Sequence, residues 1–308
     1  MHLFLRSSLF SSLKSHVLIL SVLFAALNFP AIAQDEDVIS VDSSLVILNA
    51  TIRDRNGIPV SGLDRSRFEI FEDGKKQEIS FFETEDTPFA AVILIDTSGS
   101  MEQRVSLARS ATIKFLEGIR TDDHVAVYNF DSKVSLVQDF SNLRDLSFRA
   151  FDLKASGWTA LNDAIYEAAQ ALEKRPEKRR AIVVLSDGAD TRSGRSSDKA
   201  LKEALGINAL IYTVDMTGLQ TGGKERMQNQ GVLKNFAEKS GGIFVKTPGG
   251  AELRDAFENI VKELGVQYTL GYYPANDSKD GKWREIELKV ADKGLDVRTR
   301  KGYNAPKN

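Results

Sequence analysis

The stretch A-V-I-L-I-D-T-S-G-S, from Ala91 to Ser100, constrains the fold of this chain more than any other. Its first half, Val92–Ile95, is a short apolar run rich in β-branched residues, which is typical of a strand buried on both faces of a parallel sheet. The run ends at Asp96, and two hydroxyl side chains, Ser98 and Ser100, follow it. Open α/β sheets bind ligands at the carboxyl ends of their strands, and hard divalent cations prefer oxygen ligands. The sequence therefore predicts an α/β domain with a metal site at this strand end.

Residues 1–33 are predicted to be a signal peptide rather than part of the fold. Arg6 and Lys14 give a weakly basic start, an apolar run covers Val17–Leu27, and Ala31-Ile32-Ala33 offers an A-x-A cleavage site. The apolar run is shorter than the roughly 20 residues that a membrane-spanning helix needs. This favours cleavage, with an uncleaved membrane anchor as the alternative. We expect an exported protein, periplasmic or secreted, without a stable membrane span after cleavage.

Cysteine and histidine are scarce, which excludes several kinds of site. The chain contains no cysteine and three histidines, and only His124 lies beyond the predicted signal peptide. This composition excludes disulfides, zinc–thiolate centres, thiol nucleophiles and a histidine-rich zinc site. The formal net charge of −2 gives no general attraction to nucleic acid, so we expect no nucleic-acid partner.

The segments 34–87 and 266–308 are predicted to be β-rich. The expected strands cover 46–53, 68–71, 79–82, 268–273, 285–290 and 295–300, and several of them alternate apolar with polar residues. Asp73-Gly74 predicts a hairpin turn between two of these strands, 68–71 and 79–82. Neither segment is long enough to build a core of its own. We therefore expect the two segments to pair into one small, discontinuous β-sandwich domain.

Residues 88–265 alternate predicted strands with predicted helices. The strands are expected at 92–95, 125–130, 134–137, 181–185 and 209–214, and the helices at 105–119, 161–172, 197–205, 231–240 and 251–264. This alternation indicates a doubly wound, mostly parallel sheet with helices on both faces. The glycine-rich stretch Gly218–Gly231 is predicted to be a mobile loop near the metal edge. The basic run Lys174–Arg180 is predicted to be a solvated loop at the opposite end.

Two further segments supply oxygen ligands. Gly157-Trp158-Thr159-Ala160-Leu161 places the hydroxyl of Thr159 at the mouth of a helix, and a second buried strand ends in Ser186-Asp187-Gly188. Each candidate also has a structural interpretation: Thr159 and the two serines as helix caps, and Asp187-Gly188 as a turn. Because the carboxyl ends of parallel strands meet at one edge, we expect the candidates to converge there. The expected site comprises Asp96, Ser98, Ser100, Thr159 and Asp187.

These motifs resemble those of the von Willebrand factor type A domains, also called integrin I-like domains, and in particular of exported bacterial members with β-rich flanking segments. Asp96-Thr97-Ser98-Gly99-Ser100 matches the D-x-S-x-S pattern of the family's metal-ion-dependent adhesion site, and Met101 continues the form D-T-S-G-S-M. The segments around Thr159 and Asp187 resemble the family's threonine loop and its last motif. The resemblance covers residues 88–265.

The resemblance implies a bound divalent cation, Mg2+, with Mn2+ or Ca2+ as alternatives. Ser98, Ser100 and Thr159 would coordinate it through hydroxyls, while Asp96 and Asp187 would act largely through bridging water and hydrogen bonds. A Glu or Asp side chain of a partner protein would complete the coordination. The residues expected at the partner-binding rim are Gly99, Met101, Trp158 and Gly188, with core packing as the alternative for the tryptophan. In the family, ligation can also move the last helix, here 251–264, which is a separate hypothesis for this chain.

The leading prediction is therefore an exported, metal-dependent protein-binding or adhesion module rather than an enzyme. A structural cell-envelope protein, in which the metal only staples loops, is the alternative. A metal-dependent hydrolase is less favoured because it needs a general base near the metal. His124 precedes a predicted strand at the opposite end, and D-x-S-x-S lacks the second acid of D-x-D motifs. Nothing in the sequence indicates the oligomeric state.

Overall fold

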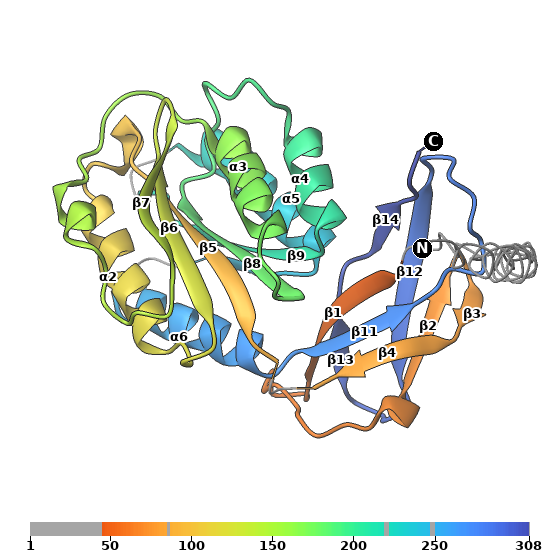
Figure 1. Cartoon of the computed structure of the whole chain (residues 1–308). Helices are drawn as coiled ribbons and strands as arrows, with labels where there is room; N and C mark the ends of the chain where they lie inside the picture. The colour runs from red at the N-terminus through yellow and green to blue at the C-terminus, as the bar shows by residue number, and fades with distance from the viewer. Residues whose placement is uncertain (1–44, 85–86, 219–221, 247–249, 308) are drawn as a thin grey trace, which may run out of the picture. The chain divides into compact units, whose positions relative to one another are not determined.

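The computed structural model describes residues 45–84, 87–218, 222–246 and 250–307, so the predicted signal peptide lies outside the described residues. They belong to one compact unit, Ser43–Asn308. Within these ranges the strands form one six-stranded sheet and two four-stranded sheets (Figure 1). No helix in the described part of the chain is long and apolar enough to cross a membrane.

The six-stranded sheet is almost entirely parallel. In chain order its strands are β5 (Phe89–Asp96), β6 (His124–Phe130), β7 (Val134–Ser141), β8 (Arg179–Ser186), β9 (Ala209–Asp215) and β10 (Phe244–Lys246). Their order across the sheet is β10-β9-β8-β5-β6-β7, and β7 alone pairs antiparallel to its neighbour. Every residue of β5 is buried, as expected for an apolar run at the centre of a parallel sheet. The predicted mostly parallel sheet is confirmed.

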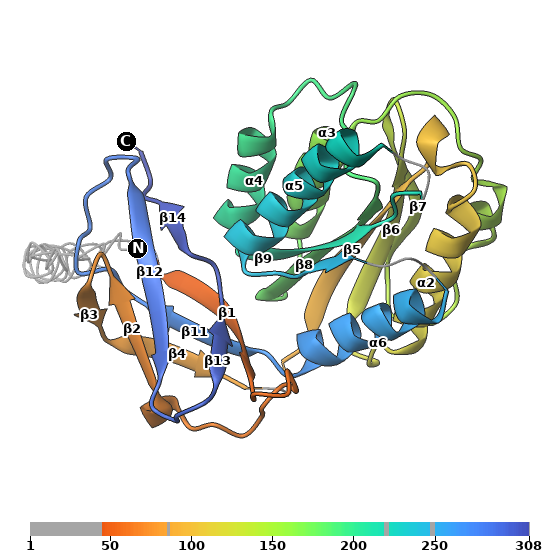
Figure 2. The same ribbon diagram turned by 180° about the vertical axis from the view of Figure 1, so that it is seen from behind.

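Helices cover both faces of this sheet. They are α2 (Val105–Glu117), α3 (Leu161–Glu173), α4 (Ser197–Gly206), α5 (Gly223–Ser240) and α6 (Ala251–Gly265). α2 and α6 lie on one face, and α3, α4 and α5 lie on the other (Figure 2). Successive side chains of β5 alternate between the two cores: Ile93 and Ile95 pack on the α2 side, and Val92 and Leu94 pack on the α3 side. The predicted α/β class with helices on both faces is confirmed.

The predicted loop Gly218–Gly231 is wrong over most of its length. Helix α5 begins at Gly223 and includes Gly231, so only the start of the stretch lies outside the helix. The residues Lys224–Gln230 are K-E-R-M-Q-N-Q, most of which favour helices and outweigh the flanking glycines. The short strand β10, which follows α5, was not predicted because three residues carry too little periodicity to detect.

The strands before and after the α/β region build two four-stranded sheets together. They are β1 (Val46–Arg53), β2 (Phe68–Glu72), β3 (Lys75–Gln77), β4 (Ile79–Glu83), β11 (Tyr268–Tyr272), β12 (Trp283–Val290), β13 (Asp296–Arg298) and β14 (Gly302–Asn304). The sheet orders are β13-β1-β11-β4 and β14-β12-β2-β3, so each sheet needs strands from both segments. Leu48, Ile70, Leu270 and Leu288 belong to the one core that they share. The strands thus form the expected discontinuous sandwich, while the boundaries 34–87, 88–265 and 266–308 stay predictions.

The hairpin at Asp73-Gly74 differs from its prediction in its second strand. Both turn residues have positive φ, 47° and 76°, as a tight two-residue hairpin turn requires. Such a turn pairs the residues directly beside it, so β2 pairs with β3 rather than with β4. The strand β4, which was expected to close the hairpin, belongs to the other sheet and pairs with β11.

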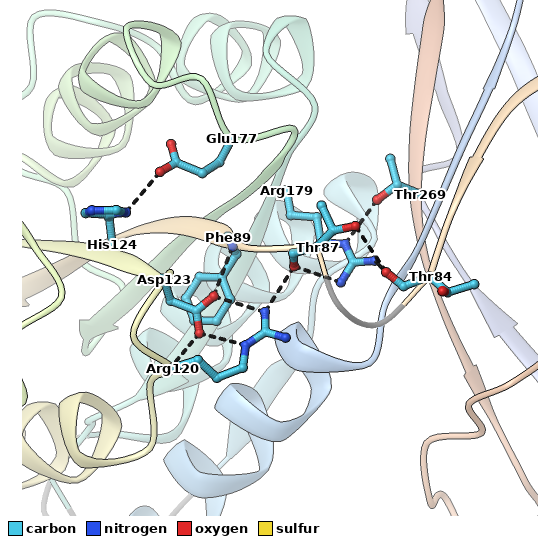
Figure 3. Close-up of polar contacts among 9 residues, drawn as sticks. All are labelled: Thr84, Thr87, Phe89, Arg120, Asp123, His124, Glu177, Arg179 and Thr269. Atoms are coloured by element: carbon cyan, nitrogen blue, oxygen red, sulfur yellow. Dashed lines mark hydrogen bonds and ion pairs between the residues drawn. The ribbon is translucent and has the colours of Figure 1, made fainter.

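The prediction that the basic run Lys174–Arg180 is solvated is wrong at Arg179, whose side chain is fully buried. Its Nε donates to Thr269 Oγ1 at 3.1 Å and its Nη1 donates to the Thr87 carbonyl at 3.2 Å. It also donates to the carbonyl of Thr84 (Figure 3). Arg179 therefore joins β8 to the two segments through which the chain enters and leaves the α/β domain. These partners lie about 90 residues away in sequence, so the run of charge does not reveal them.

Candidate functional site

The carboxylate of Asp96 lies at the carboxyl end of β5 and is fully buried. Its Oδ1 accepts hydrogen bonds from the Ser98 backbone N–H at 2.9 Å and from the Ser98 hydroxyl at 2.6 Å. The Oγ atoms of Ser98 and Ser100 are 3.2 Å apart. Ser98 is buried and Ser100 is exposed. The turn after β5 therefore presents two adjacent hydroxyls, one fixed by a buried carboxylate and one open to solvent.

The helix-capping interpretation of these hydroxyls finds no support. Ser98 occupies the N-cap of the short 3-10 helix Gly99–Met101, yet its side chain makes no capping hydrogen bond. The N-cap of α3 is Ala160, and no side chain caps that end. Thr159, one residue earlier, is 4% exposed. Capping therefore does not account for either Ser98 or Thr159.

The electrostatics of Asp96 bring in Asp187, at the end of the neighbouring strand β8. The pKa of Asp96 is raised to about 7, with burial as the main cause and the charge of Asp187 as a further one. Hydrogen bonds from Ser186 and Ser98 oppose this increase. Two acidic side chains thus lie close enough to repel each other at one edge of the sheet. A cation at this edge would relieve the repulsion.

Ser186 is a site residue that the sequence analysis missed. Its hydroxyl donates to Asp96 Oδ2 at 2.6 Å and accepts the Gly188 backbone N–H at 3.0 Å. It therefore connects the carboxylate at the end of β5 with the turn that follows β8. The signal was available, since a serine directly before Asp187 at the end of a buried apolar run repeats the hydroxyl–carboxylate combination of the first strand.

Hydrogen bonds attach the loop that carries Thr159 to the turn after β5 and to the segment after β8. The Gly99 N–H donates to the Gly157 carbonyl at 3.2 Å, which attaches this loop to the turn after β5. The Thr159 N–H donates to Thr191 Oγ1 at 3.0 Å, and the Thr191 N–H donates to the Thr159 carbonyl at 2.9 Å. These bonds attach the same loop to the segment after β8. The three predicted segments therefore lie against one another at one edge of the sheet.

Asp187 and Gly188 also form the turn that their sequence suggests. Gly188 has a φ of +84°, and Asp187 Oδ1 accepts the Ala189 N–H at 3.1 Å. A Cβ at position 188 would lie 2.4 Å from the Asn229 carbonyl oxygen of α5. Glycine is therefore required here both for its backbone conformation and for the close approach of α5. The turn and the candidate ligand role of Asp187 coexist.

Of the four residues predicted at the partner-binding rim, two are exposed and two are buried. Trp158 is 62% exposed, so the alternative of core packing is wrong for it. Gly99 is also exposed. Met101 is 1% exposed and packs in the α2-side core, and Gly188 is buried beneath α5. The prediction of a partner contact is therefore wrong for Met101 and Gly188, because their surfaces are already covered by the protein itself.

The donor set fits a small divalent cation. Octahedral Mg2+ holds its oxygens at about 2.1 Å, so neighbouring ligand oxygens lie about 3.0 Å apart. The Ser98–Ser100 separation of 3.2 Å is close to this value. Among the described residues, no group of three or more His, Cys, Asp and Glu side chains could hold a metal. A cation at this edge would therefore depend on hydroxyl ligands together with Asp96 and Asp187.

Comparison with known proteins finds a family model that matches the central part of the chain. Residues 91–189 match the family model of the von Willebrand factor type A domain. The chain is 26% identical to inter-alpha-trypsin inhibitor heavy chain H3 of Bos taurus over 208 residues, covering 61% of this chain and 23% of that protein. It is also 26% identical to the uncharacterized protein sll0103 of Synechocystis over 182 residues, covering 58% of this chain and 42% of the relative. The chain thus spans less than half the length of either relative.

Similar solved structures include a von Willebrand factor type A protein from Catenulispora acidiphila. That match has a TM-score of 0.48 at 12% identity and covers 86% of this chain and 75% of the other. The von Willebrand factor domain of the type V pilus tip protein Mfa5 from Porphyromonas gingivalis matches with a TM-score of 0.48 at 15% identity. It covers 57% of this chain and 94% of the other.

Proposed function

We propose that this chain, whose residues 91–189 match a von Willebrand factor type A domain, is an exported module that binds a partner protein through a divalent cation. The observation that carries the proposal is the pair of hydroxyls on Ser98 and Ser100, 3.2 Å apart and backed by the buried Asp96. Hydrogen bonds join the segments of Thr159 and Asp187 to the turn that carries this pair, and Ser100 is exposed. Such an arrangement supports a site completed from outside.

In the proposed site Ser98, Ser100 and Thr159 coordinate Mg2+, with Mn2+ or Ca2+ as alternatives. Asp96 and Asp187 act through bridging water and through hydrogen bonds to the hydroxyls, as the bond from Ser98 to Asp96 illustrates. When bound, the cation supplies a positive charge that neutral hydroxyls leave largely uncompensated. Such a charge attracts an anionic oxygen, and Mg2+ commonly keeps exchangeable water positions. A Glu or Asp side chain of the partner takes one of these positions.

Trp158 extends the proposed contact surface beyond the cation. Its indole is 62% exposed, and the next residue in the chain is Thr159. The Trp158 backbone is held in place, because its N–H donates to Ser132 Oγ at 3.1 Å. Tryptophan on a fixed backbone is a typical centre of interface binding energy. The proposed partner therefore carries an apolar side chain close to its acidic residue.

The position of His124 supports binding over metal-dependent hydrolysis. Asp96 pairs with Phe130 at the carboxyl end of β6, whereas His124 pairs with Ala90 at the amino end. Six residues of strand separate the two positions, which corresponds to about 20 Å. The His124 Nδ1 lies 3.1 Å from the Glu177 carboxylate, far from the proposed metal edge. This histidine is therefore badly placed to act as a general base there.

The experiment combines direct metal titration with partner capture. Calorimetry with Mg2+ and Mn2+ on the purified protein should show one site, and Asp96→Ala should lose it while circular dichroism reports an intact fold. The protein should then retain a binding partner from an envelope extract in Mg2+ and release it in EDTA. Unchanged capture by a folded Asp96→Ala variant contradicts the adhesion proposal. Metal binding without any EDTA-sensitive partner favours the structural envelope alternative.

A further inference from the structure

The end of β9 repeats the geometry found at the end of β5. Asp215 and Thr217 form a D-x-T turn, and both are almost completely buried. Asp215 Oδ1 accepts the Thr217 backbone N–H at 2.9 Å and also the Thr217 hydroxyl. Asp96 Oδ1 accepts the corresponding N–H of Ser98 at the same distance, 2.9 Å, and its hydroxyl. β8, which Asp187 directly follows, lies between these two strands.

The residues Asp215–Thr217 of the turn after β9 are buried, whereas the turn after β5 has the exposed Ser100. The remaining oxygen of Asp215, Oδ2, accepts a hydrogen bond of 2.6 Å from the side-chain amide of Gln230 on α5. Among the described residues of this turn no hydroxyl is exposed, because Thr217, the counterpart of Ser98, is 2% exposed and bonded to Asp215. Both oxygens of Asp215 accept hydrogen bonds from neutral donors, as those of Asp96 do, so the exposed Ser100 is what distinguishes the turn after β5. The turn after β9 therefore acts as a support rather than as a second cation site.

This support reaches the backbone of the candidate ligand Asp187. The Thr217 hydroxyl lies 3.5 Å from the Asp187 carbonyl oxygen, and the Met216 N–H donates to the Ser186 carbonyl at 2.9 Å. The turn after β9 thus lies along the segment that carries Ser186 and Asp187. Gln230 stands at the far end of this series of contacts, in the first part of α5, which lies within the predicted loop Gly218–Gly231.

The same part of α5 also contacts the Asp187 loop sterically. A Cβ added at Gly188 would meet the Asn229 carbonyl oxygen at 2.4 Å and Leu233 Cγ at 2.9 Å. Asn229 and Leu233, which flank Gln230 on α5, therefore leave Gly188 no room to move toward this helix. α5 therefore contacts the Asp187 loop in two ways, by polar contacts through Asp215 and by packing against Gly188.

We infer that Gln230 is a positioning residue for the proposed metal site, acting through Asp215 and Thr217 on the Asp187 loop. The inference rests on the proposed function for its metal-binding consequence. Without the amide, the buried Asp215 loses the donor to its Oδ2, so its turn and the adjoining backbone of Asp187 rearrange to satisfy the carboxylate. Metal ligands need placement within about 0.5 Å, so such a shift weakens binding.

The test compares Gln230→Leu with Gln228→Leu, a matched control at an exposed position of the same helix. In metal-free protein, amide hydrogen exchange at Gly188 and Ala189 should become at least tenfold faster in Gln230→Leu only. Exchange at Ile93 and Val183, in the strand centres, should stay as in the wild type. The Kd for Mn2+ should rise at least tenfold in Gln230→Leu and remain unchanged in Gln228→Leu.

Gln230→Glu separates positioning from a general structural role. Its ionised carboxylate repels Asp215, whereas its protonated form donates a hydrogen bond as the native amide does. The ratio of its Mn2+ Kd to that of the wild type at the same pH should therefore fall toward one between pH 7.5 and pH 5. The inference is overturned if amide exchange at Gly188 and Ala189 in Gln230→Leu keeps its wild-type rate. It is also overturned if exchange becomes faster uniformly over the core. Absence of Mn2+ binding by the wild type overturns the proposed function instead, and the metal-free exchange experiment still decides the inference.

Discussion

Ser186 donates its hydroxyl hydrogen to Asp96 Oδ2 across 2.6 Å, which joins the ends of β8 and β5. The same Oγ accepts the Gly188 N–H at 3.0 Å. One hydroxyl therefore fixes both the buried carboxylate of the first motif and the turn that carries Asp187. This hydroxyl therefore adds a side-chain link between the two acidic residues to the backbone pairing of β5 with β8.

Ser186→Ala should lower the free energy of unfolding by about 1–3 kcal/mol, because it leaves the buried Asp96 Oδ2 without its donor. Urea unfolding measures this loss. Ser110→Ala, on the exposed face of α2, is the matched control and should change stability by less than about 0.5 kcal/mol. Equal stability of the two variants would show that the Ser186 bond contributes nothing.

Gly188→Ala should destabilise the protein by at least about 1–3 kcal/mol, since alanine is strained at a φ of +84°. Its Cβ would in addition clash with the Asn229 carbonyl oxygen. Gly206→Ala is the control, because this glycine ends α4 with no atom within 4 Å of an added Cβ. Thermal unfolding should show a lower Tm for the first variant and an unchanged or higher Tm for the second. A Gly188→Ala protein with native Tm would refute the close packing of α5 on the loop.

Trp158→Ala should weaken binding of the EDTA-sensitive partner about tenfold or more, which corresponds to about 1.4 kcal/mol. Its affinity for Mn2+ should stay unchanged, because the indole is not a proposed ligand. Leu143→Ala removes a similarly exposed apolar side chain elsewhere, 63% against 62%, and should not affect either affinity. Surface plasmon resonance for the partner and calorimetry for the metal separate the two effects. A loss of metal affinity in Trp158→Ala would place this residue in the site itself.

Asp163 should contribute stability that depends on pH. Burial raises its pKa, but hydrogen bonds from the Gly194 N–H and from Arg195 outweigh this effect and lower it below the ordinary value. A lowered folded-state pKa means that the stabilisation is complete above the unfolded pKa, about 3.9, and is lost as the pH falls through the folded pKa.

The prediction is tested by urea unfolding of Asp163→Asn between pH 7 and pH 2. Wild type should be more stable than the variant at pH 7, and the difference should shrink below about pH 4. Asp122→Asn, in the exposed turn before β6, controls for the loss of one negative charge. A difference that stays constant down to pH 2 would contradict the role of the ionised carboxylate.

Arg179→Met should lower the free energy of unfolding by about 2–4 kcal/mol. The substitution removes the buried donors that serve Thr269 Oγ1 and the carbonyls of Thr84 and Thr87. Lys174→Met, at an exposed position of the same basic run, should cost less than about 0.5 kcal/mol. Denaturant unfolding measures both. Similar values for the two variants would restore the interpretation of this run as a solvated loop.

The sequence alone was sufficient for the parts of the fold that depend on local patterns. Fully apolar runs such as Val92–Ile95 occur in strands buried on both faces, and spacing of three to four residues marked the helices. The turn at Asp73-Gly74 was also recognisable, because few residue pairs tolerate two positive φ values. The choice of its partner strand was not, since pairing β4 with β11 depends on residues nearly 190 positions away.

For the candidate site, the motif Asp96-Thr97-Ser98-Gly99-Ser100 indicated which residues to consider, and it did so from residue chemistry alone. Tertiary structure decided which of their surroundings matter. Ser186, Asp215 and Gln230 became relevant only because β5, β8, β9 and α5 lie side by side, and Met101 and Gly188 left the rim because the core and α5 cover them. A sequence specifies chemical groups and local conformation, whereas burial and hydrogen-bond partners arise from contacts between distant segments.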